Sequence, residues 1–167
     1  LIDGGADNDH VDYNSETTFT GDTATHGVIV NLSSSSLTDV SVDGIATTTV
    51  LGGTAIDTRN YVDTLISIES VRGTGYDDII VGGADNNQLE GEGGTDFLHG
   101  GDGEDFLHGG GGDDTLIGGG ASDFDSDFFV GGRGNDTLIG GEHDNEFNRV
   151  LYEGETDWGN ADSGTHG

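Results

Sequence analysis

Apolar residues recur at one place in a nine-residue unit over residues 73–141. Divided at its glycines, this stretch reads GTGYDDIIV, GGADNNQLE, GEGGTDFLH, GGDGEDFLH, GGGGDDTLI, GGGASDFDSDFFV, GGRGNDTLI and the start of another copy, with four inserted residues in the sixth unit. Because side chains alternate across a strand, each unit predicts a six-residue loop and a three-residue strand. Positions seven and nine point outward, and position eight points inward, at Ile80, Leu89, Leu98, Leu107, Leu116, Phe129 and Leu138.

Two units, or eighteen residues, close one turn of a flattened helix in this interpretation, and alternate units stack on opposite edges. The sequence therefore predicts an all-β fold, a parallel β-roll or β-helix. An earlier copy of the unit, GGADNDHVD, stands at residues 4–12, and Leu1 begins within the pattern. We therefore expect the chain to be a fragment of a longer protein.

Residues 13–72 contain less Gly and more Ser and Thr. Alternating apolar positions in GVIVNL, DVSVDGI and VDTLISIESV predict short strands joined by polar loops. We expect this segment to continue the stack with longer loops, and a separate small sandwich is the alternative. The expected divisions are the end of an upstream array at 1–12, the longer-looped segment at 13–72, the main array at 73–145, and a terminal strand with a polar tail at 146–167.

Charge narrows the classes of function. The chain has 33 acidic residues against four Arg and no Lys, a net charge of −29. Nucleic-acid binding needs a basic surface, and an anionic membrane surface would repel this chain. No apolar run is long enough to insert into a membrane. The absence of Cys excludes disulfides, iron–sulfur clusters and thiol catalysis.

The sixth position of the unit carries the candidate chemistry. Stacked carboxylates ~4.8 Å apart would repel each other by roughly 3.5 kcal/mol at an effective dielectric constant of 20. A divalent cation between them reverses the sign. Ca²⁺ accepts six to eight oxygen ligands, including the backbone carbonyls that Gly-rich loops expose, whereas Mg²⁺ demands stricter geometry and Zn²⁺ prefers His or Cys. The candidate ligands are Asp9, Asp78, Asn87, Asp96, Asp105, Asp114, Asp127 and Asp136, with Asp77 and the loop glycines Gly94, Gly103, Gly112 and Gly134.

Asp63 and Glu69 precede the array. They either complete a cation site at its start or are solvated. His99 and His108 occupy position nine of successive units, so we expect them on the surfaces of opposite sheets and not at a metal site. The outward Phe97, Phe106 and Phe128 are interpreted as partial cover over a thin roll, with a contact patch as the alternative.

At this point the units resemble the RTX family of hemolysin-type calcium-binding repeats, whose nonapeptide is G-G-x-G-x-D-x-U-x. Residues 100–108, 109–117 and 131–139 match it at every defined position, whereas Asp85, Asn87 and the loop of 73–81 depart from it. Residues 62–78 resemble a segment that often precedes such arrays in bacterial surface proteins. The resemblance implies a right-handed parallel β-roll, about six Ca²⁺ ions, type I secretion from a Gram-negative bacterium, and folding on extracellular Ca²⁺.

The expected function is therefore a calcium-binding structural module of a secreted or cell-surface protein, in an S-layer, adhesin or extracellular fibre. The alternative is the secretion and folding module of a secreted hydrolase, protease or epimerase whose catalytic domain lies elsewhere. Expected partners are Ca²⁺, flanking repeats, and a second copy or a cell-surface partner. We expect no catalysis in this chain, because no Lys and no cluster of Arg or Tyr is available to bind a substrate.

Overall fold

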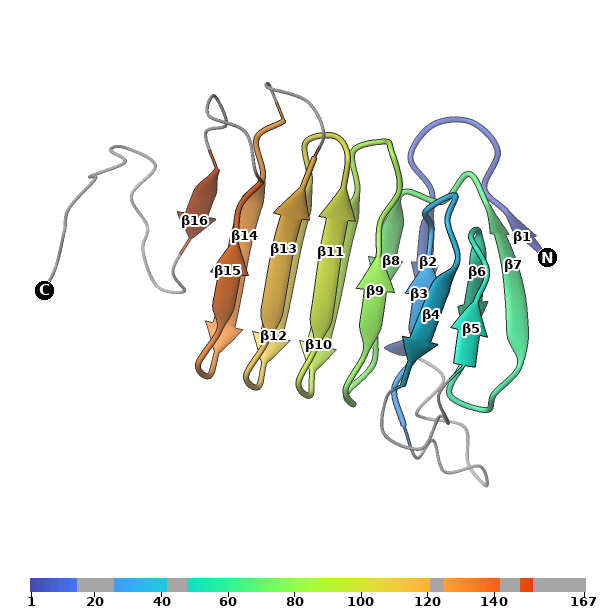
Figure 1. The fold of residues 1–167 in the computed structure, drawn as a ribbon, viewed down its shortest axis with the longest axis horizontal. Helices are drawn as coiled ribbons and strands as arrows, with labels where there is room; N and C mark the ends of the chain where they lie inside the picture. Colours follow the sequence, from blue (N-terminus) through green and yellow to red (C-terminus); the bar gives the residue numbers. More distant parts are fainter. Residues whose placement is uncertain (15–25, 42–47, 121–124, 142–147, 152–167) are drawn as a thin grey trace, which may run out of the picture.

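Strands stack side by side along the chain, and the loops that join them lie at two opposite edges (Figure 1). The structure is a computed structural model, and it describes residues 1–14, 26–41, 48–120, 125–141 and 148–151. Within these ranges no helix is long and apolar enough to cross a membrane. The predicted all-β class is confirmed.

Two sheets face each other. One has the order β1-β7-β6-β3-β9-β11-β13-β15, and the other has the order β16-β14-β12-β10-β8-β2. The strands of the first are β1 (Ile2–Asp3), β7 (Val62–Ile66), β6 (Thr54–Ile56), β3 (Ile29–Asn31), β9 (Ile79–Val81), β11 (Phe97–Gly101), β13 (Thr115–Gly119) and β15 (Thr137–Ile139). Those of the second are β16 (Arg149–Leu151), β14 (Phe128–Arg133), β12 (Phe106–Gly111), β10 (Gln88–Gly93), β8 (Ser70–Arg72) and β2 (His10–Asp12).

The pairing register confirms that two units form one turn. Leu89 of β10 lies opposite Leu107 of β12, and Leu98 of β11 lies opposite Leu116 of β13, eighteen residues later in both cases. Across the four-residue insertion the spacing becomes twenty-two residues, and Leu107 lies opposite Phe129. All these pairs are parallel. Successive units therefore alternate between the two sheets, as the pattern predicts.

The eighth positions form the core between the sheets. From Ile80 to Leu116 they are fully buried, and Phe129 is 1% exposed. The strands extend further than predicted, because the glycines that open the next unit continue the pairing: β12 runs from Phe106 to Gly111. The inward alternation thus places the first glycine of a unit inside the stack as well.

Residues before the array join the same two sheets, but not only in parallel. β3 pairs in parallel with β9, and β8 pairs in parallel with β2 and β10. However, β6 is antiparallel to both β3 and β7, a feature that the repeat pattern did not predict. A hairpin of β4 (Leu37–Val40) and β5 (Thr48–Val50) contributes to a second apolar cluster with β3, so Ile29 is buried although it faces away from the main core.

Residues 62–71 contain short strands, as predicted, but not all of their apolar residues are buried. Leu65, Ile68 and Val71 are buried, but Val62 is 66% exposed and Ile66 is 45% exposed. The segment breaks into β7 and β8, which belong to different sheets, so one alternation does not run through it. The predicted positions Val42 and Ile45 lie outside the described residues, and so does Tyr152 after β16.

Candidate metal centre

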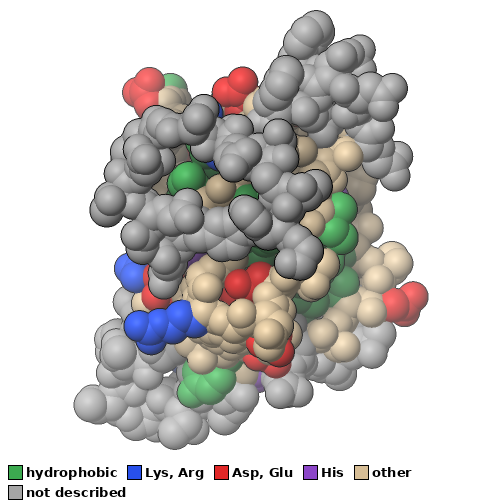
Figure 2. Space-filling model, turned by 90° about the vertical axis from the view of Figure 1, so that its left-hand side faces the viewer, with side chains coloured by type: hydrophobic (Ala, Val, Ile, Leu, Met, Phe, Trp, Pro, Cys, Tyr) green, Lys and Arg blue, Asp and Glu red, His purple; other side chains and the backbone are tan. Residues whose placement is uncertain are grey.

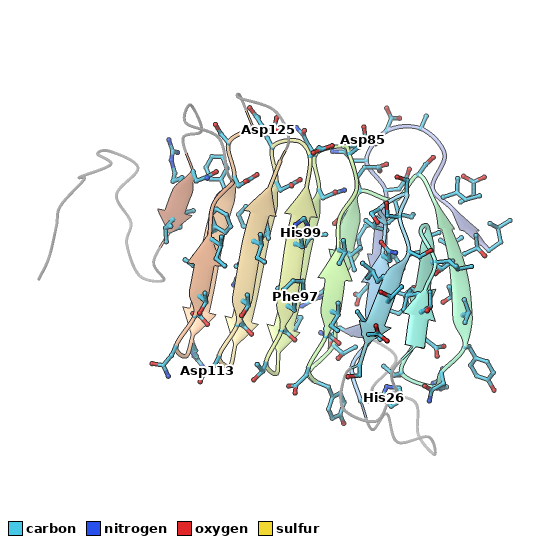
Figure 3. All side chains as sticks on the ribbon, viewed as in Figure 1. His26, Asp85, Phe97, His99, Asp113 and Asp125 are labelled. Carbon is cyan, nitrogen blue, oxygen red and sulfur yellow. The ribbon has the colours of Figure 1, made fainter. Side chains whose placement is uncertain are left out.

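The sixth-position side chains are inside the molecule, at the two edges where the strands turn. Asp78, Asp96, Asp105, Asp114 and Asp127 are each at most 2% exposed. Asp78, Asp96, Asp114 and Asp136 form one column, and Asn87, Asp105 and Asp127 belong to the other. Figure 3 shows the two edges: Asp113 lies at the one opposite to Asp85 and Asp125.

Each column is joined by a hydrogen bond from backbone to side chain. The backbone N–H of Asp78 donates to Oδ1 of Asp96 at 2.9 Å, and that of Asp96 donates to Oδ1 of Asp114 at 2.8 Å. In the second column the N–H of Asn87 donates to Oδ1 of Asp105 at 2.7 Å. One oxygen of each acceptor carboxylate is therefore held by the preceding turn.

The other oxygen has no partner in four of these residues. Oδ2 of Asp9, Asp96, Asp105 and Asp114 is buried and accepts no hydrogen bond from the residues that the structure describes. An unsatisfied buried polar atom costs stability and calls for an explanation such as an ion. Here the unsatisfied atom is Oδ2 of the sixth-position residue in each of these units. The absence of a partner is therefore a property of the repeated unit and not a local defect.

The unpartnered oxygens and backbone carbonyl oxygens of the next turn lie close to the first glycine of each unit, in the space that a side chain would occupy. A Cβ placed on Gly91 would lie 2.2 Å from Oδ2 of Asp96 and 2.7 Å from the carbonyl oxygen of Gly109. On Gly100 it would lie 2.1 Å from Oδ2 of Asp105 and 2.8 Å from the carbonyl oxygen of Gly118. The first glycine of the unit is thus required for space, because a Cβ there would collide with the column carboxylate and with the backbone of the next turn.

The fourth-position glycines do serve the turn. Gly94, Gly103, Gly112 and Gly134 all have φ between 104° and 133°, which side chains rarely adopt. They also sit directly on the preceding loop, since a Cβ on Gly112 would lie 1.7 Å from the carbonyl oxygen of Gly94. The loops therefore stack with their backbones in close contact.

The donor set fits a hard cation. Among the described residues, no group of three or more His, Asp or Glu side chains is arranged to hold a metal ion by itself. A cation at these positions would therefore take one carboxylate oxygen from a column and backbone carbonyls such as those of Gly109 and Gly118. Ca²⁺ accepts this all-oxygen mixture at flexible geometry, whereas Zn²⁺ prefers nitrogen or sulfur.

Burial makes these carboxylates costly to ionise. It raises the pKa of Asp96 to about 8, that of Asp105 to about 7 and that of Asp78 to about 6, and the pKa of Asp114 is raised as well. Neighbouring carboxylates add to the burial effect on Asp96 and Asp105. A cation at the unpartnered oxygens would remove the cost, because it favours the charged form.

Asp77 takes part in a second clamp that the sequence analysis did not identify. The N–H of Thr95 donates to Oδ1 of Asp77 at 2.6 Å, and the N–H of Asn135 donates to Oδ1 of Asp113 at 2.8 Å. This bond runs from the later turn to the earlier one, opposite to the bond at position six. Neighbouring turns are thus held in both directions.

The structure separates Asp63 from Glu69. Glu69 precedes β8 as a sixth-position residue, and its Oε2 accepts the N–H of Asp9 at 3.1 Å, so it belongs to the second column. Asp63 lies within β7, opposite Ala55 of the antiparallel β6.

Asn148 was missed by the sequence analysis. Its Oδ1 accepts the N–H of Asp127 at 2.9 Å, so it extends the second column by one turn. The available signal was its place directly before the strand Arg149–Leu151.

Histidine and phenylalanine lie on the outer faces. His99 on β11 and His108 on β12 belong to opposite sheets. Phe106 lies opposite Phe128, and the guanidinium of Arg149 is 5.1 Å from the Phe128 ring centre. Figure 2, which views the stack from the side of β16, shows acidic side chains at several separate places and hydrophobic ones on its flanks.

Comparison with known families identifies the repeated unit. The family model of the RTX calcium-binding nonapeptide repeat (four copies) matches residues 72–107, 90–125 and 123–148. No curated protein matches the chain. The matched residues include the stacked carboxylates from Asp78 to Asp136, and residues 1–71 lie outside them.

Proposed function

On the basis that residues 72–148 are RTX-type calcium-binding repeats, we propose that the chain is a structural module that folds and stiffens on extracellular Ca²⁺, within a secreted or cell-surface protein of a Gram-negative bacterium. It acts as a scaffold or adhesive element of an S-layer, adhesin or extracellular fibre. It carries out no catalysis, and its partners besides Ca²⁺ are flanking repeats and a second copy or a surface molecule.

One observation supports calcium-dependent folding most strongly. Asp96, Asp105 and Asp114 each bury a carboxylate oxygen that has no partner in the described part of the chain. Without a cation these oxygens lower the stability of the folded chain. With Ca²⁺ bound, the same atoms become ligands. These oxygens therefore destabilise the folded chain without metal and stabilise it when Ca²⁺ is bound.

Calcium concentration outside and inside a cell then decides the state of the chain. Extracellular calcium modules bind with dissociation constants of roughly 10⁻⁴–10⁻³ M. At about 10 mM Ca²⁺ each such site contributes roughly 1.4–2.7 kcal/mol, and at cytosolic concentrations it contributes almost nothing. The net charge of −29 opposes folding further when no cation is present.

Equilibrium dialysis against radioactive Ca²⁺ tests the site assignment. We expect the wild-type chain to bind several ions, and Asp96→Asn and Asp105→Asn each to weaken or remove binding of at least one. Asp3→Asn, at an exposed position of β1, is the control and retains all of them. Unchanged binding in both column variants would contradict the assignment.

Sedimentation velocity tests the scaffold role. In Ca²⁺ we expect the module either to self-associate or to sediment as an elongated folded particle. In chelator we expect the chain to unfold and expand, which lowers its sedimentation coefficient. A compact monomer with identical sedimentation in both conditions would argue against a role that depends on calcium-induced stiffening.

A further inference from the structure

The first turn of the array, residues 73–90, closes its loops differently from the turns that follow. In the second position of the regular units, φ is positive: Gly5, Glu92, Gly101, Gly110 and Gly132 have φ between 78° and 111°. Thr74 and Gly83, at the same position in the first turn, do not have a positive φ. The peptide that enters the loop is therefore oriented differently in these two units.

With this backbone conformation, the N–H of the second position points at the sixth-position side chain of its own unit. The N–H of Thr74 donates to Oδ2 of Asp78 at 2.6 Å, and the N–H of Gly83 donates to Oδ1 of Asn87 at 2.7 Å. These bonds occupy the side-chain oxygens from inside the same unit. In the described part of the regular units, no second-position N–H makes such a bond to Asp96, Asp105 or Asp114, whose Oδ2 has no partner.

The remaining polar side-chain atoms of Asp78 and Asn87 also have partners. Oδ1 of Asp78 accepts the N–H of Val28 at 2.7 Å and the hydroxyl of Thr74 at 3.0 Å. Nδ2 of Asn87 donates to the carbonyl oxygen of Glu69 at 3.1 Å. Neither side chain keeps a buried atom without a partner.

The sequence explains why this turn differs. The fourth position is Gly with positive φ in the units of 91–117 and 131–139, but it is Tyr76 and Asp85 in the first turn, where φ is not positive. The fourth position alone does not decide the loop, because Asp7 in the loop GGADND has a φ of 78°, and the loop GGADNN at 82–87 differs from it only in Asn87. Asp85 lies at the loop edge of the stack (Figure 3). Asn87 then supplies an N–H donor that a carboxylate lacks.

We propose that residues 73–90 form a calcium-independent turn, in which hydrogen bonds from Thr74, Gly83 and the amide of Asn87 replace the cation, and that this turn is the template on which the calcium-dependent turns assemble. The inference rests on the proposed calcium function for the regular units. It removes Asn87 from the ligands, and it places the boundary between the two kinds of turn at Gly91.

The template position follows from the contacts of this turn on both sides. β8 and β3 precede it, and β10 and β9 of the turn itself pair onward with β12 and β11. It thus joins the longer-looped segment to the regular array. If this turn folds without metal, its strands β9 and β10 can pair with β11 and β12 of the next turn as soon as Ca²⁺ is present.

Hydrogen exchange with mass spectrometry on the full chain tests the order of assembly. During a titration from chelator into Ca²⁺, we expect amides of 79–81 and 88–90 to become protected at a lower concentration than those of 115–119 and 137–139. Simultaneous protection of all four segments, or earlier protection of the later ones, would overturn the proposal.

A pair of isosteric variants tests the role of the amide. Asn87→Asp removes the Nδ2 donor and supplies a free carboxylate oxygen, so we expect less protection of 88–90 in chelator and one additional bound Ca²⁺. Asp105→Asn, the reverse change at the next position of the same column, is the matched comparison and is expected to lose one bound ion. If Asn87→Asp leaves both readouts unchanged, the proposal is wrong.

These measurements distinguish failure of the proposed calcium function from failure of the proposed calcium-independent turn. If no variant or wild-type chain binds Ca²⁺, the proposed function fails. The comparison of wild type with Asn87→Asp in chelator does not require calcium binding, and it still decides whether hydrogen bonds of Asn87 hold the first turn.

Discussion

The backbone N–H of Asp78 donates to Oδ1 of Asp96, eighteen residues later, at 2.9 Å, while Oδ2 of Asp96 stays buried without a partner. One carboxylate thus serves two purposes, since it joins adjacent turns and leaves one oxygen for a cation. Burial raises its pKa to about 8, so the free energy of folding depends on what neutralises it. A proton and a calcium ion compete for this role.

Asp96→Asn therefore has effects of opposite sign in the two conditions. At pH 8.5 in chelator, with sucrose added to bring the transition into range, we expect the fraction folded to stay equal or rise, because the buried charge at this position is removed. At about 10 mM Ca²⁺ the variant loses roughly 1.4–2.7 kcal/mol of unfolding free energy, the contribution of one site. Loss of stability in both conditions to the same extent would contradict this role.

The metal-free chain is expected to become less stable as pH rises. The folded pKa values of Asp78, Asp105 and Asp96 are raised to about 6, 7 and 8 from an ordinary value of 3.8. A carboxyl group whose pKa is raised by folding binds more protons in the folded state than in the unfolded state, so stability falls as pH rises above about 4 and levels off once pH has passed the highest folded pKa, about 8. Circular dichroism in chelator and sucrose between pH 5.5 and 8.5 measures this.

Saturating Ca²⁺ provides the control for the pH experiment. A bound cation keeps the column carboxylates ionised, so the decline with pH should flatten or reverse. An increase of stability with pH in chelator would show that buried carboxylates do not dominate the metal-free state.

Gly100→Ala is expected to damage both stability and calcium binding. The added Cβ would lie 2.1 Å from Oδ2 of Asp105, where nothing but a shift of the carboxylate or backbone makes room. Such overpacking costs about 1–3 kcal/mol. Gly75→Ala is the matched control, because nothing lies within 4 Å of its Cβ position and its φ is not positive. Thermal unfolding in Ca²⁺ measures both, and equal effects would contradict the space requirement.

Leu107→Ala tests the core between the sheets. Leu107 is fully buried, and its loss is expected to cost about 2–5 kcal/mol in Ca²⁺. Phe97 is on the outer face of β11 and 36% exposed, so Phe97→Ala is the comparison and should cost much less (Figure 3). A larger loss for Phe97→Ala would indicate that the outer face is covered in solution.

The core and the two-unit turn could be predicted from sequence because the same position of every nine-residue unit, the eighth, is apolar. Leu89 and Leu107 occupy the eighth place of alternate units, and strand geometry then determines which way both point. The same periodicity correctly separates the columns of Asp96 and Asp105. These features depend on local alternation and on spacing alone.

Other features depend on contacts that no local pattern records. The antiparallel β6 results from a long excursion between β3 and β7, and Glu69 enters its column only because β8 lies beside β2. The space over Gly100 becomes visible once Gly118 of the next turn is placed above it. Departures from the repeat at Asp85 and Asn87 could be read, but their hydrogen bonds could not.

Far-UV circular dichroism during a Ca²⁺ titration, with Mg²⁺ as control, measures whether a bound cation holds this fold together. We expect a weak β signal in chelator, a cooperative gain near millimolar Ca²⁺, and no comparable gain with Mg²⁺, which demands stricter octahedral geometry. A full β signal in chelator that Ca²⁺ leaves unchanged would contradict the claim that a cation at the buried carboxylates holds this fold.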